Sequence, residues 1–451
     1  MIPAESFLTE TLRLHPQGQA VARILAAAVN AVEPGAAVRR FALRTGQSLT
    51  VAGQSYDLAS FRRVCLLALG KAAAPMAAAL ADLLGERLTA GLVVTKHAAS
   101  GGRLAGLTVL EGDHPVPGPR SLEAGERILE FVSALGSGDL LFCLISGGGS
   151  ALAAAPLPGV ALADLQALTG ALLACGARID EINALRRRLD RLKGGGLVRL
   201  AGGATVIGLI LSDVVGSPLE AIASGPTAPD PSRRAEALAV LSKYKLHKKI
   251  PASVLHSLRT SAETPKAGDP LFASVQNVII GSNLTAAQAA LKQAEAEGFH
   301  PYLLRTDLQG EARQAGFELA TQLRQAWQTG DPVPPPACLV AGGETTVSLR
   351  GGGRGGRNTE LALSAVTELA GFPGVLLVTL ASDGEDGPTE AAGAVVTGET
   401  FRRAAALGLH PVEYLERNDS YSFFAALGDL LKPGPTGTNV NDLVFLFTLP
   451  G

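Results

Sequence analysis

The sequence of 451 residues contains few cysteines and few aromatic residues, and it carries almost no net charge. Aromatic residues make up 4% of the chain, so alanine, leucine and valine must supply most of the packing. The formal charge of −2 provides no basic surface that would attract nucleic acid or anionic lipid. The cysteines form no C-x-x-C pair, and we expect buried free thiols in a reducing compartment at Cys65, Cys143, Cys175 and Cys338.

Long hydrophobic runs and several familiar motifs are also missing. No window of about 18 apolar residues occurs, and Glu5 and Glu10 interrupt the N-terminus where a signal peptide needs an apolar core. The seven histidines show no H-x-x-x-H spacing and no cysteine partner, which argues against a zinc site. The sequence also lacks the G-x-S-x-G motif of serine hydrolases. We expect a cytoplasmic protein, monomeric or homodimeric, that binds neither nucleic acid nor membrane.

Apolar segments of strand length alternate with helical segments along most of the chain. Strands that read as continuous apolar runs, such as residues 63–70 and 139–146, indicate a largely parallel sheet with both faces covered. The length exceeds what one hydrophobic core usually supports. The sequence therefore predicts an α/β fold of two three-layer α/β/α domains with largely parallel, Rossmann-like sheets and an active-site cleft between them. The expected divisions are an N-terminal domain over 1–250, a connection over 251–270 and a C-terminal domain over 271–451.

A second series of strands and helices is expected after the connection. Its first strand is predicted at 275–281, and later strands are predicted at 337–343, 345–351 and 374–384. In open α/β sheets, ligands bind where loops leave the carboxyl ends of the strands. The residues that follow each predicted strand are therefore the candidates for a functional site.

A glycine cluster follows the predicted strand 139–145. Consecutive glycines let the backbone approach an anion closely at a helix N-terminus, and the flanking serines could donate hydrogen bonds or cap the helix. The alternative is a tight turn with no ligand. Leu152 breaks the G-x-G-x-x-G pattern of dinucleotide sites. The candidate binding residues are Ser146, Gly147, Gly148, Gly149 and Ser150.

Charged residues follow several other predicted strands. Lys71 follows Gly70 and could neutralise phosphate oxygens, although the Walker spacing is absent and a surface lysine is the alternative. Asp213 ends a buried strand and could orient a metal, act as a base or merely cap a helix. Further candidates at strand ends and turns are Glu344, Asp383, Asp386, Thr438, Asn439 and Asp442.

The segment 351–357 is the densest in glycine. Its glycines match G-x-G-x-x-G, which would suggest a dinucleotide, but no acidic residue stands about 20 residues on to bind a ribose hydroxyl. Arg354 and Arg357 in this loop are instead suited to bidentate recognition of carboxylate or phosphate. Glycine loops, cations and strand-end carboxylates together form the inventory that phosphoryl transfer requires.

The order of these motifs resembles the glycerate 2-kinases with a C-terminal MOFRL domain, a class that also includes hydroxypyruvate-reductase-labelled proteins of tartrate utilisation. The resemblance covers nearly the whole chain. It is carried by "GKAAAPM", "GDHPVP", "LISGGGSAL", "INALRRRLDRLKGGGL", "LILSDVVG", "IASGPTAPDP", "GGETTVSLRGGGRGGRNTELAL", "SDGEDGPTEAAGA" and "GPTGTNVNDL". It implies phosphorylation of D-glycerate to 2-phosphoglycerate with ATP and Mg²⁺.

The polar positions of the family fall on Lys71, Asp213, Glu344, Arg357, Asp383 and Asn439. Because of the loops in which they lie, our hypothesis is that Lys71 and Arg357 stabilise transition-state and substrate charge and that Asp213 deprotonates the substrate hydroxyl or holds Mg²⁺. Glu344 and Asp383 are expected to contact metal or substrate hydroxyls, with Asp213 and Glu344 as the metal candidates, and Asn439 to orient the substrate.

The sequence departs from the family pattern at two places. Ser217 stands where relatives usually carry an acid, and Arg187 and Arg188 replace a usual Lys-His pair. Two alternatives to the kinase stay open at this point. One is an NAD(P)H-dependent hydroxypyruvate reductase, and the other is a non-catalytic protein that binds a phosphorylated metabolite.

Overall fold

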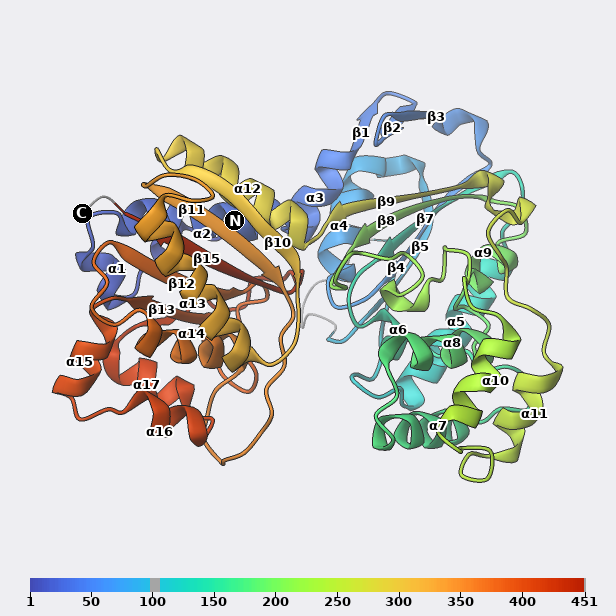
Figure 1. Cartoon of the computed structure of the whole chain (residues 1–451). Helices are drawn as coiled ribbons and strands as arrows, with labels where there is room; N and C mark the ends of the chain where they lie inside the picture. Colours follow the sequence, from blue (N-terminus) through green and yellow to red (C-terminus); the bar gives the residue numbers. More distant parts are fainter. Residues whose placement is uncertain (98–105, 450–451) are drawn as a thin grey trace. The chain divides into compact units, whose positions relative to one another are not determined.

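The computed structural model describes residues 1–97 and 106–449. Contacts divide the chain into two units, each described by itself (Figure 1). We name them by their place in the sequence: the middle unit is Pro34–Ile280, and the terminal unit combines Met1–Glu33 with Gly281–Gly451. This grouping differs from the expected linear division, because helix α2 (Gly18–Ala31) packs against α12 (Asn283–Ala296).

The middle unit is built on a six-stranded sheet, and the predicted α/β class is confirmed there. The pairs β6–β5, β5–β4, β4–β7 and β7–β8 are all parallel. Parallel neighbours need long crossover connections, and the segments between these strands are long enough to supply them. The order in the sheet is β6 (Thr108–Glu111), β5 (Leu88–Thr95), β4 (Arg63–Leu69), β7 (Asp139–Ile145), β8 (Thr205–Leu211) and β9 (Val275–Gly281).

Strand β9 corrects one expectation. The strand at 275–281 was expected to begin the second series, but it is hydrogen-bonded beside β8 at the edge of the first sheet. The expected connection 251–270 likewise contains a helix, α11 (Ala252–Thr260), whose Val254 and Leu258 are buried in a cluster of the middle unit. The first series therefore extends farther along the chain than its composition suggests.

Helices cover both faces of the first sheet. In β4, Cys65, Leu67 and Leu69 pack in one cluster with helix α5, whereas Leu66 and Ala68 point to the opposite face, where α4 packs. The continuous apolar run of β4 follows from this burial on both sides. The helices of the middle unit are α3 (Pro34–Phe41), α4 (Ala73–Leu84), α5 (Pro119–Ser133), α6 (Gly149–Leu152), α7 (Leu162–Ala174), α8 (Ile179–Leu189), α9 (Gly196–Leu200), α10 (Arg234–Lys243) and α11.

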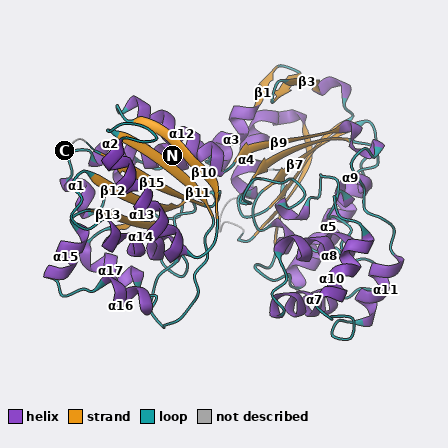
Figure 2. Cartoon of the chain, in the orientation of Figure 1, coloured by secondary structure: helices purple, strands orange, loops and turns teal. Residues whose placement is uncertain are grey.

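A small antiparallel sheet in the middle unit was not predicted. It consists of β1 (Ala42–Thr45), β2 (Ser48–Val51) and β3 (Gln54–Asp57), joined by tight turns. Figure 2 shows these short strands beside the helices and loops of this unit.

The terminal unit has a mixed sheet, and the prediction of a largely parallel sheet is wrong for it. Among its described strands only β10 and β11 pair in parallel, whereas β15 runs antiparallel between β11 and β12. Strands β13 and β14 extend the antiparallel part. The order is β10 (His300–Leu308), β11 (Ala337–Gly343), β15 (Asp442–Thr448), β12 (Val375–Ala381), β13 (Gly393–Thr397) and β14 (Leu430–Leu431).

The strand predicted at 345–351 does not form. Thr346 makes only an isolated bridge with Glu311, and the Ser348 amide donates to the Glu311 carboxylate. Leu349 is 83% exposed, so the alternating apolar side chains of this segment do not pack against a hydrophobic core.

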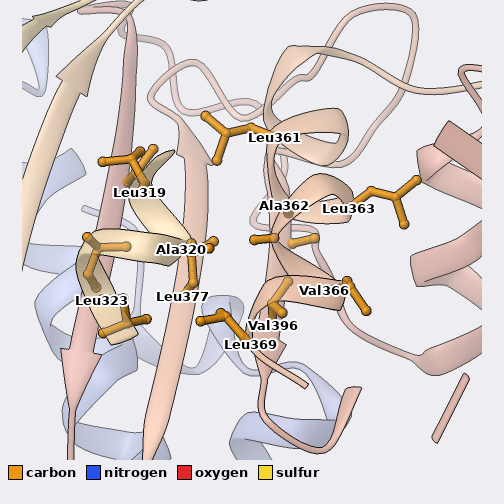
Figure 3. Packing of buried hydrophobic residues seen from close by; sticks show 14 of the residues in the cluster. Leu319, Ala320, Leu323, Leu361, Ala362, Leu363, Val366, Leu369, Leu377 and Val396 are labelled. Carbon is orange, nitrogen blue, oxygen red and sulfur yellow. The ribbon is translucent and has the colours of Figure 1, made fainter. Parts of the chain in front are cut away.

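The core of the terminal unit lies between helices and the sheet. Leu319 and Leu323 of α13 (Ala312–Thr329) pack with Leu361 of α14 (Arg357–Glu368) and Leu377 of β12 (Figure 3). This packing fixes α14 against the sheet. The remaining helices of the unit are α1 (Glu10–Leu14), α2, α12, α15 (Thr400–Ala406), α16 (Pro411–Glu416) and α17 (Ser420–Leu427).

All four cysteines are free, as expected. Cys65, Cys143 and Cys338 are buried, whereas Cys175 is only partly buried. Among the described residues, no single helix combines the length and apolarity needed to cross a bilayer, although α2 and α3 taken together pass that test.

A buried ion pair at the start of β7 generates a prediction about stability. The fully buried Asp139 carboxylate bonds to the guanidinium groups of Arg62 and Arg63, and these bonds hold its pKa well below the usual range. Replacing Asp139→Asn is expected to lower the free energy of unfolding by about 2 kcal/mol at neutral pH, because charged hydrogen bonds are lost. Urea unfolding measures this value.

The difference should shrink progressively as the pH falls below about 4, because the unfolded carboxylate then becomes protonated, and it should vanish as the pH falls through the depressed native pKa. Arg127→Gln, which breaks a surface pair with Glu130, is the control and should change the free energy by less than about 1 kcal/mol. Equal effects of the two substitutions at neutral pH would contradict the prediction.

Candidate functional site

The first group of candidate residues lies where three neighbouring parallel strands of the middle unit end. Lys71 follows β4, the glycine cluster follows β7 and Asp213 follows β8. Because the carboxyl ends of parallel strands meet at one edge of a sheet, these residues lie close together as the sequence predicted. We call them the glycine-loop cluster.

Contacts between backbones join the loops after β4 and β7. The Lys71 amide donates to the Gly147 carbonyl at 2.9 Å, and the Ala72 amide donates to Ser146 Oγ at 3.0 Å. A Cβ atom on Gly70 would lie 2.2 Å from Ser146 Oγ. The backbone of Gly70, with φ of +134°, also favours glycine. The buried Ser146 hydroxyl therefore holds the two loops together.

Asp213 packs against the glycine loop. A Cβ atom on Gly147 would lie 2.0 Å from Asp213 Oδ2, so the carboxylate occupies the space that a side chain would fill. Burial raises the pKa of Asp213, and the nearby charge of Lys71 partly offsets this effect. A carboxylate with a raised pKa is better suited to accept a proton than an exposed aspartate.

The loop leaves several donors available. Gly148, with φ of +82°, lies against the side chains of His114 and Lys71. Within residues 1–97 and 106–449, the amides of Gly147 and Gly148 donate no hydrogen bond, and the Lys71 ammonium group has no hydrogen bond or ion pair. Free amides beside a cation form a suitable environment for an anion.

The other two candidates in the glycine cluster have partners inside the protein. A Cβ atom on Gly149 would lie 2.9 Å from the Cβ of Ala223, so this glycine permits close packing. The Ser150 hydroxyl bonds to the Ser224 hydroxyl at 2.9 Å, and Ser224 bonds to Asn183. The cluster therefore combines structural residues with the open backbone at Gly147 and Gly148.

The structure gives a local account of the departures from the family pattern. Arg187 pairs with the buried Asp230 at 2.7 Å, and Arg188 bonds to Glu263 and to the Ser232 carbonyl. Both arginines therefore have structural partners. Ser217 has φ of +52° and closes a turn through its amide to the Val214 carbonyl.

The second group of candidates lies at one end of the mixed sheet in the terminal unit, and we call it the arginine cluster. Arg357, the first residue of α14, bonds to both carboxylate oxygens of Asp442 at 2.5 and 3.2 Å and to Glu344 at 2.8 Å. The Arg357 side chain is still 31% exposed. It therefore combines fixed orientation with access for a ligand.

Two more candidates belong to this end of the sheet. Asp383 follows β12, and burial raises its pKa, with the charge of Asp442 adding to the effect. Asn439 accepts a hydrogen bond from the Asn441 amide at 3.0 Å, which forms a local turn before β15.

Asp386 holds the helix that carries Arg357. It accepts hydrogen bonds from the amides of Asn358 and Thr359 at 2.9 and 2.8 Å, and burial raises its pKa to about 6. This carboxylate caps α14 and fixes the first turn.

The glycine-rich segment 351–356 is packed against its own unit. The amides of Gly351 and Arg354 donate to the side chains of Asn418 and Asp419, and Cβ atoms on Gly351 and Gly353 would lie within 2.7 Å of the backbone at 417–419. The Arg354 guanidinium pairs with Glu390 and lies over Tyr421. These contacts argue against a dinucleotide loop at this segment.

The predicted metal ligands do not form a preformed cluster. Over the two described ranges, no three Asp, Glu, His or Cys side chains gather in a way that could hold a metal ion. The two predicted ligands, Asp213 and Glu344, belong to different units. Mg²⁺ in nucleotide sites commonly needs only one or two carboxylates, because phosphates supply the other oxygens.

One residue beside these clusters was not among the candidates taken from the sequence. His114 lies beside the glycine loop, and burial together with Lys71 and Lys96 lowers its pKa to about 4, so the imidazole is neutral at neutral pH. The family motif "GDHPVP", which contains His114, is the feature of the sequence that could have identified this residue. Asp442 was noted before the last strand, but its pairing with Arg357 depends on strand order.

Comparisons with known proteins agree over most of the chain. A family model described as a domain of unknown function (DUF4147) matches residues 20–259, and the MOFRL family matches residues 337–442. A protein of Thermotoga maritima named D-glycerate 2-kinase is 42% identical over 384 residues, covering 85% of this chain and 90% of the relative.

A solved structure described as glycerate kinase from Thermotoga maritima superposes with a TM-score of 0.85 at 40% identity, covering 95% of this chain and 98% of that one. A protein of Agrobacterium vitis provisionally named hydroxypyruvate reductase is 41% identical over 385 residues, with 84% of this chain and 86% of the relative covered.

The contact between Gly147 and Asp213 predicts a steric effect. Gly147→Ala is expected to lower the free energy of unfolding by about 1–3 kcal/mol, because the new methyl group must displace the carboxylate. Gly170→Ala is the matched control: Gly170 is exposed on α7 with no atom within 4 Å of its added Cβ, so it should stabilise by up to about 1 kcal/mol. Urea unfolding of the two variants measures the difference, and a Gly147→Ala variant as stable as the parent would refute it.

Proposed function

Because the chain belongs to the glycerate kinase family, we propose that it transfers the terminal phosphoryl group of ATP to the 2-hydroxyl group of D-glycerate and so forms 2-phosphoglycerate. The observation that best supports this proposal within the chain is the glycine-loop cluster. A lysine and two backbone amides without partners among the described residues lie there together with a carboxylate whose pKa is raised.

Phosphoryl transfer requires charge stabilisation more than covalent participation by the protein. We assign Lys71 and the amides of Gly147 and Gly148 to the phosphate oxygens, because these donors have no described protein partner. Arg357 and the donors near it are assigned to the negative charge that develops during transfer. Fixed donors of this kind lower a barrier because they need no reorganisation.

Asp213 is the proposed base. Its carboxylate accepts the proton of the 2-hydroxyl group as the hydroxyl oxygen forms a bond to the terminal phosphorus of ATP. The bond between that phosphorus and the bridging oxygen breaks, and ADP leaves with the bonding electrons. The raised pKa of Asp213 favours this proton transfer, and the product carboxylic acid returns its proton to solvent.

The residues present fit a bound Mg²⁺ ion. Within the described ranges Asp213 has no ion pair, so it would hold the metal as the alternative to its role as base, whereas Glu344 is already paired with Arg357. Mg²⁺ would neutralise phosphate charge when bound.

Asp383 and Asn439 are assigned to the substrate hydroxyl groups and to substrate orientation. We expect the enzyme to act in the cytoplasm, a reducing compartment in which its cysteines would stay free, and to be a monomer or homodimer.

Incubation of the purified chain with ATP, Mg²⁺ and D-glycerate tests the proposed reaction. Phosphorus NMR is expected to show 2-phosphoglycerate and ADP in equal amounts. Formation of 3-phosphoglycerate would contradict the assigned position of transfer. Oxidation of NADH by hydroxypyruvate without ATP would instead support the reductase that the name of the Agrobacterium vitis relative suggests.

The paired orientation of Arg357 predicts that its geometry matters as well as its charge. Arg357→Lys keeps the charge but loses the two-point contact with Asp442, so we expect kcat/KM for D-glycerate to fall about 100-fold. Arg354→Lys, three residues away in the chain, is the control and should change kcat/KM only a few-fold. Steady-state kinetics on the two folded variants measures this difference, and equal losses would remove the role assigned to Arg357.

A further inference from the structure

A pocket in the middle unit lies beside the glycine-loop cluster. Helices α7 and α8 form much of its wall, and Ser150, which follows the glycines, also lines it. The pocket has a volume of about 40 Å³, whereas one water needs about 10–15 Å³. It therefore has room for a small group of a few heavy atoms and not for a nucleotide.

The walls are mainly apolar, with leucines from both helices. Three charged residues line the pocket: Arg186, Asp190 and Lys193. Lys193 Nζ donates to Asp190 Oδ2 at 2.5 Å, and the Asp190 carboxylate also accepts from the amides of Ala155 and Leu192. Lys193 and Asp190 therefore neutralise each other and have their hydrogen-bond partners within the protein. Among the described residues, the positive charge of Arg186 is the one charge of the pocket lining that is left unpaired.

Arg186 differs from the two arginines that follow it. Arg187 and Arg188 are buried and paired with Asp230 and Glu263, whereas Arg186 makes no hydrogen bond or ion pair to any residue within 1–97 and 106–449. Arg186 is partly buried, so its charge is partly removed from water, and this burial lowers its pKa. Such a charge is costly for the protein unless an anion joins it.

We propose that this pocket binds the carboxylate group of a small organic acid through Arg186. The planar guanidinium group matches a carboxylate through two parallel hydrogen bonds, and the apolar walls suit the short carbon chain of such an acid. The identification of this acid as D-glycerate rests on the proposed function. Ser150 lines the pocket and directly follows the glycines, so the pocket adjoins the loop assigned to the phosphate.

Binding measurements by calorimetry test this proposal without turnover. We expect the parent protein to bind D-glycerate, and to bind glycerol, which lacks the carboxylate, at least about tenfold more weakly. Arg186→Gln should weaken the binding of D-glycerate by at least about tenfold. Arg191→Gln is the matched control, because it removes the same charge from an exposed residue shortly after α8, and it should bind like the parent.

Steady-state kinetics separates binding of the acid from other roles. Arg186→Gln is expected to raise the KM for D-glycerate by at least about tenfold, with the KM for ATP unchanged and kcat within a few-fold. Its melting temperature should equal or exceed that of the parent, because an unpaired, partly buried charge is removed. A lower melting temperature together with an unchanged KM for D-glycerate would show a structural role and overturn the proposal.

The proposed pocket and the proposed reaction can fail separately. If the chain does not phosphorylate D-glycerate, the same calorimetry with lactate and pyruvate tests the pocket by itself. Arg186-dependent binding of any of these acids supports the pocket, and no such binding overturns it. Arg186-dependent binding of inorganic phosphate without binding of a carboxylic acid would also overturn it, since the pocket would then be a phosphate site.

Discussion

The close contact between Gly70 and Ser146, with no room for a Cβ atom, joins the loops that follow β4 and β7. This contact sets the positions of Lys71 and of the glycine backbone, because the same loops exchange hydrogen bonds at Lys71 and Ala72. Gly147 then leaves the space that the Asp213 carboxylate occupies. A cation, free amides and a partly desolvated acid therefore come together because glycine is present where three strands end.

The arginine cluster depends on a different constraint, which is the direction of β15. Strands β11 and β12 run opposite to β15, so their carboxyl ends meet the start of β15, and Gly343 and Ala381 both stand in register with Asp442. Glu344 and Asp383 follow at the same end. The Asp386 cap then points the first turn of α14 toward these carboxylates and places Arg357 between two of them.

Much of the fold could be predicted from local pattern. The buried strands were found because both of their faces are covered, which gives continuous apolar runs such as residues 139–145. The direction of β15 could not be found in the same way, because its apolar run reads the same in parallel and antiparallel sheets. The position of β9 beside β8 depends likewise on contacts between segments about 65 residues apart in the chain.

The candidate site, like the fold, could be predicted from local pattern only in part. Lys71, Asp213 and Arg357 were singled out because charged residues follow strands, and the structure shows each within a polar cluster. The contributions of His114 and Asp442 depend on side chains from distant segments, and sequence spacing does not reveal them. The glycines at 351–356 were misleading alone, because glycine is needed equally for packing against residues 417–419 and for a nucleotide.

The order of strands in the terminal unit also affects how the protein folds during synthesis. β15 lies between β11 and β12 in the sheet, yet it follows every other strand of that sheet in the sequence. A ribosome therefore delivers the whole middle unit, Pro34–Ile280, before the strand that joins the two halves of the second sheet. Residues 1–33 are made long before their partners in the terminal unit, so the apolar face of α2 has no native partner until α12 has been synthesised.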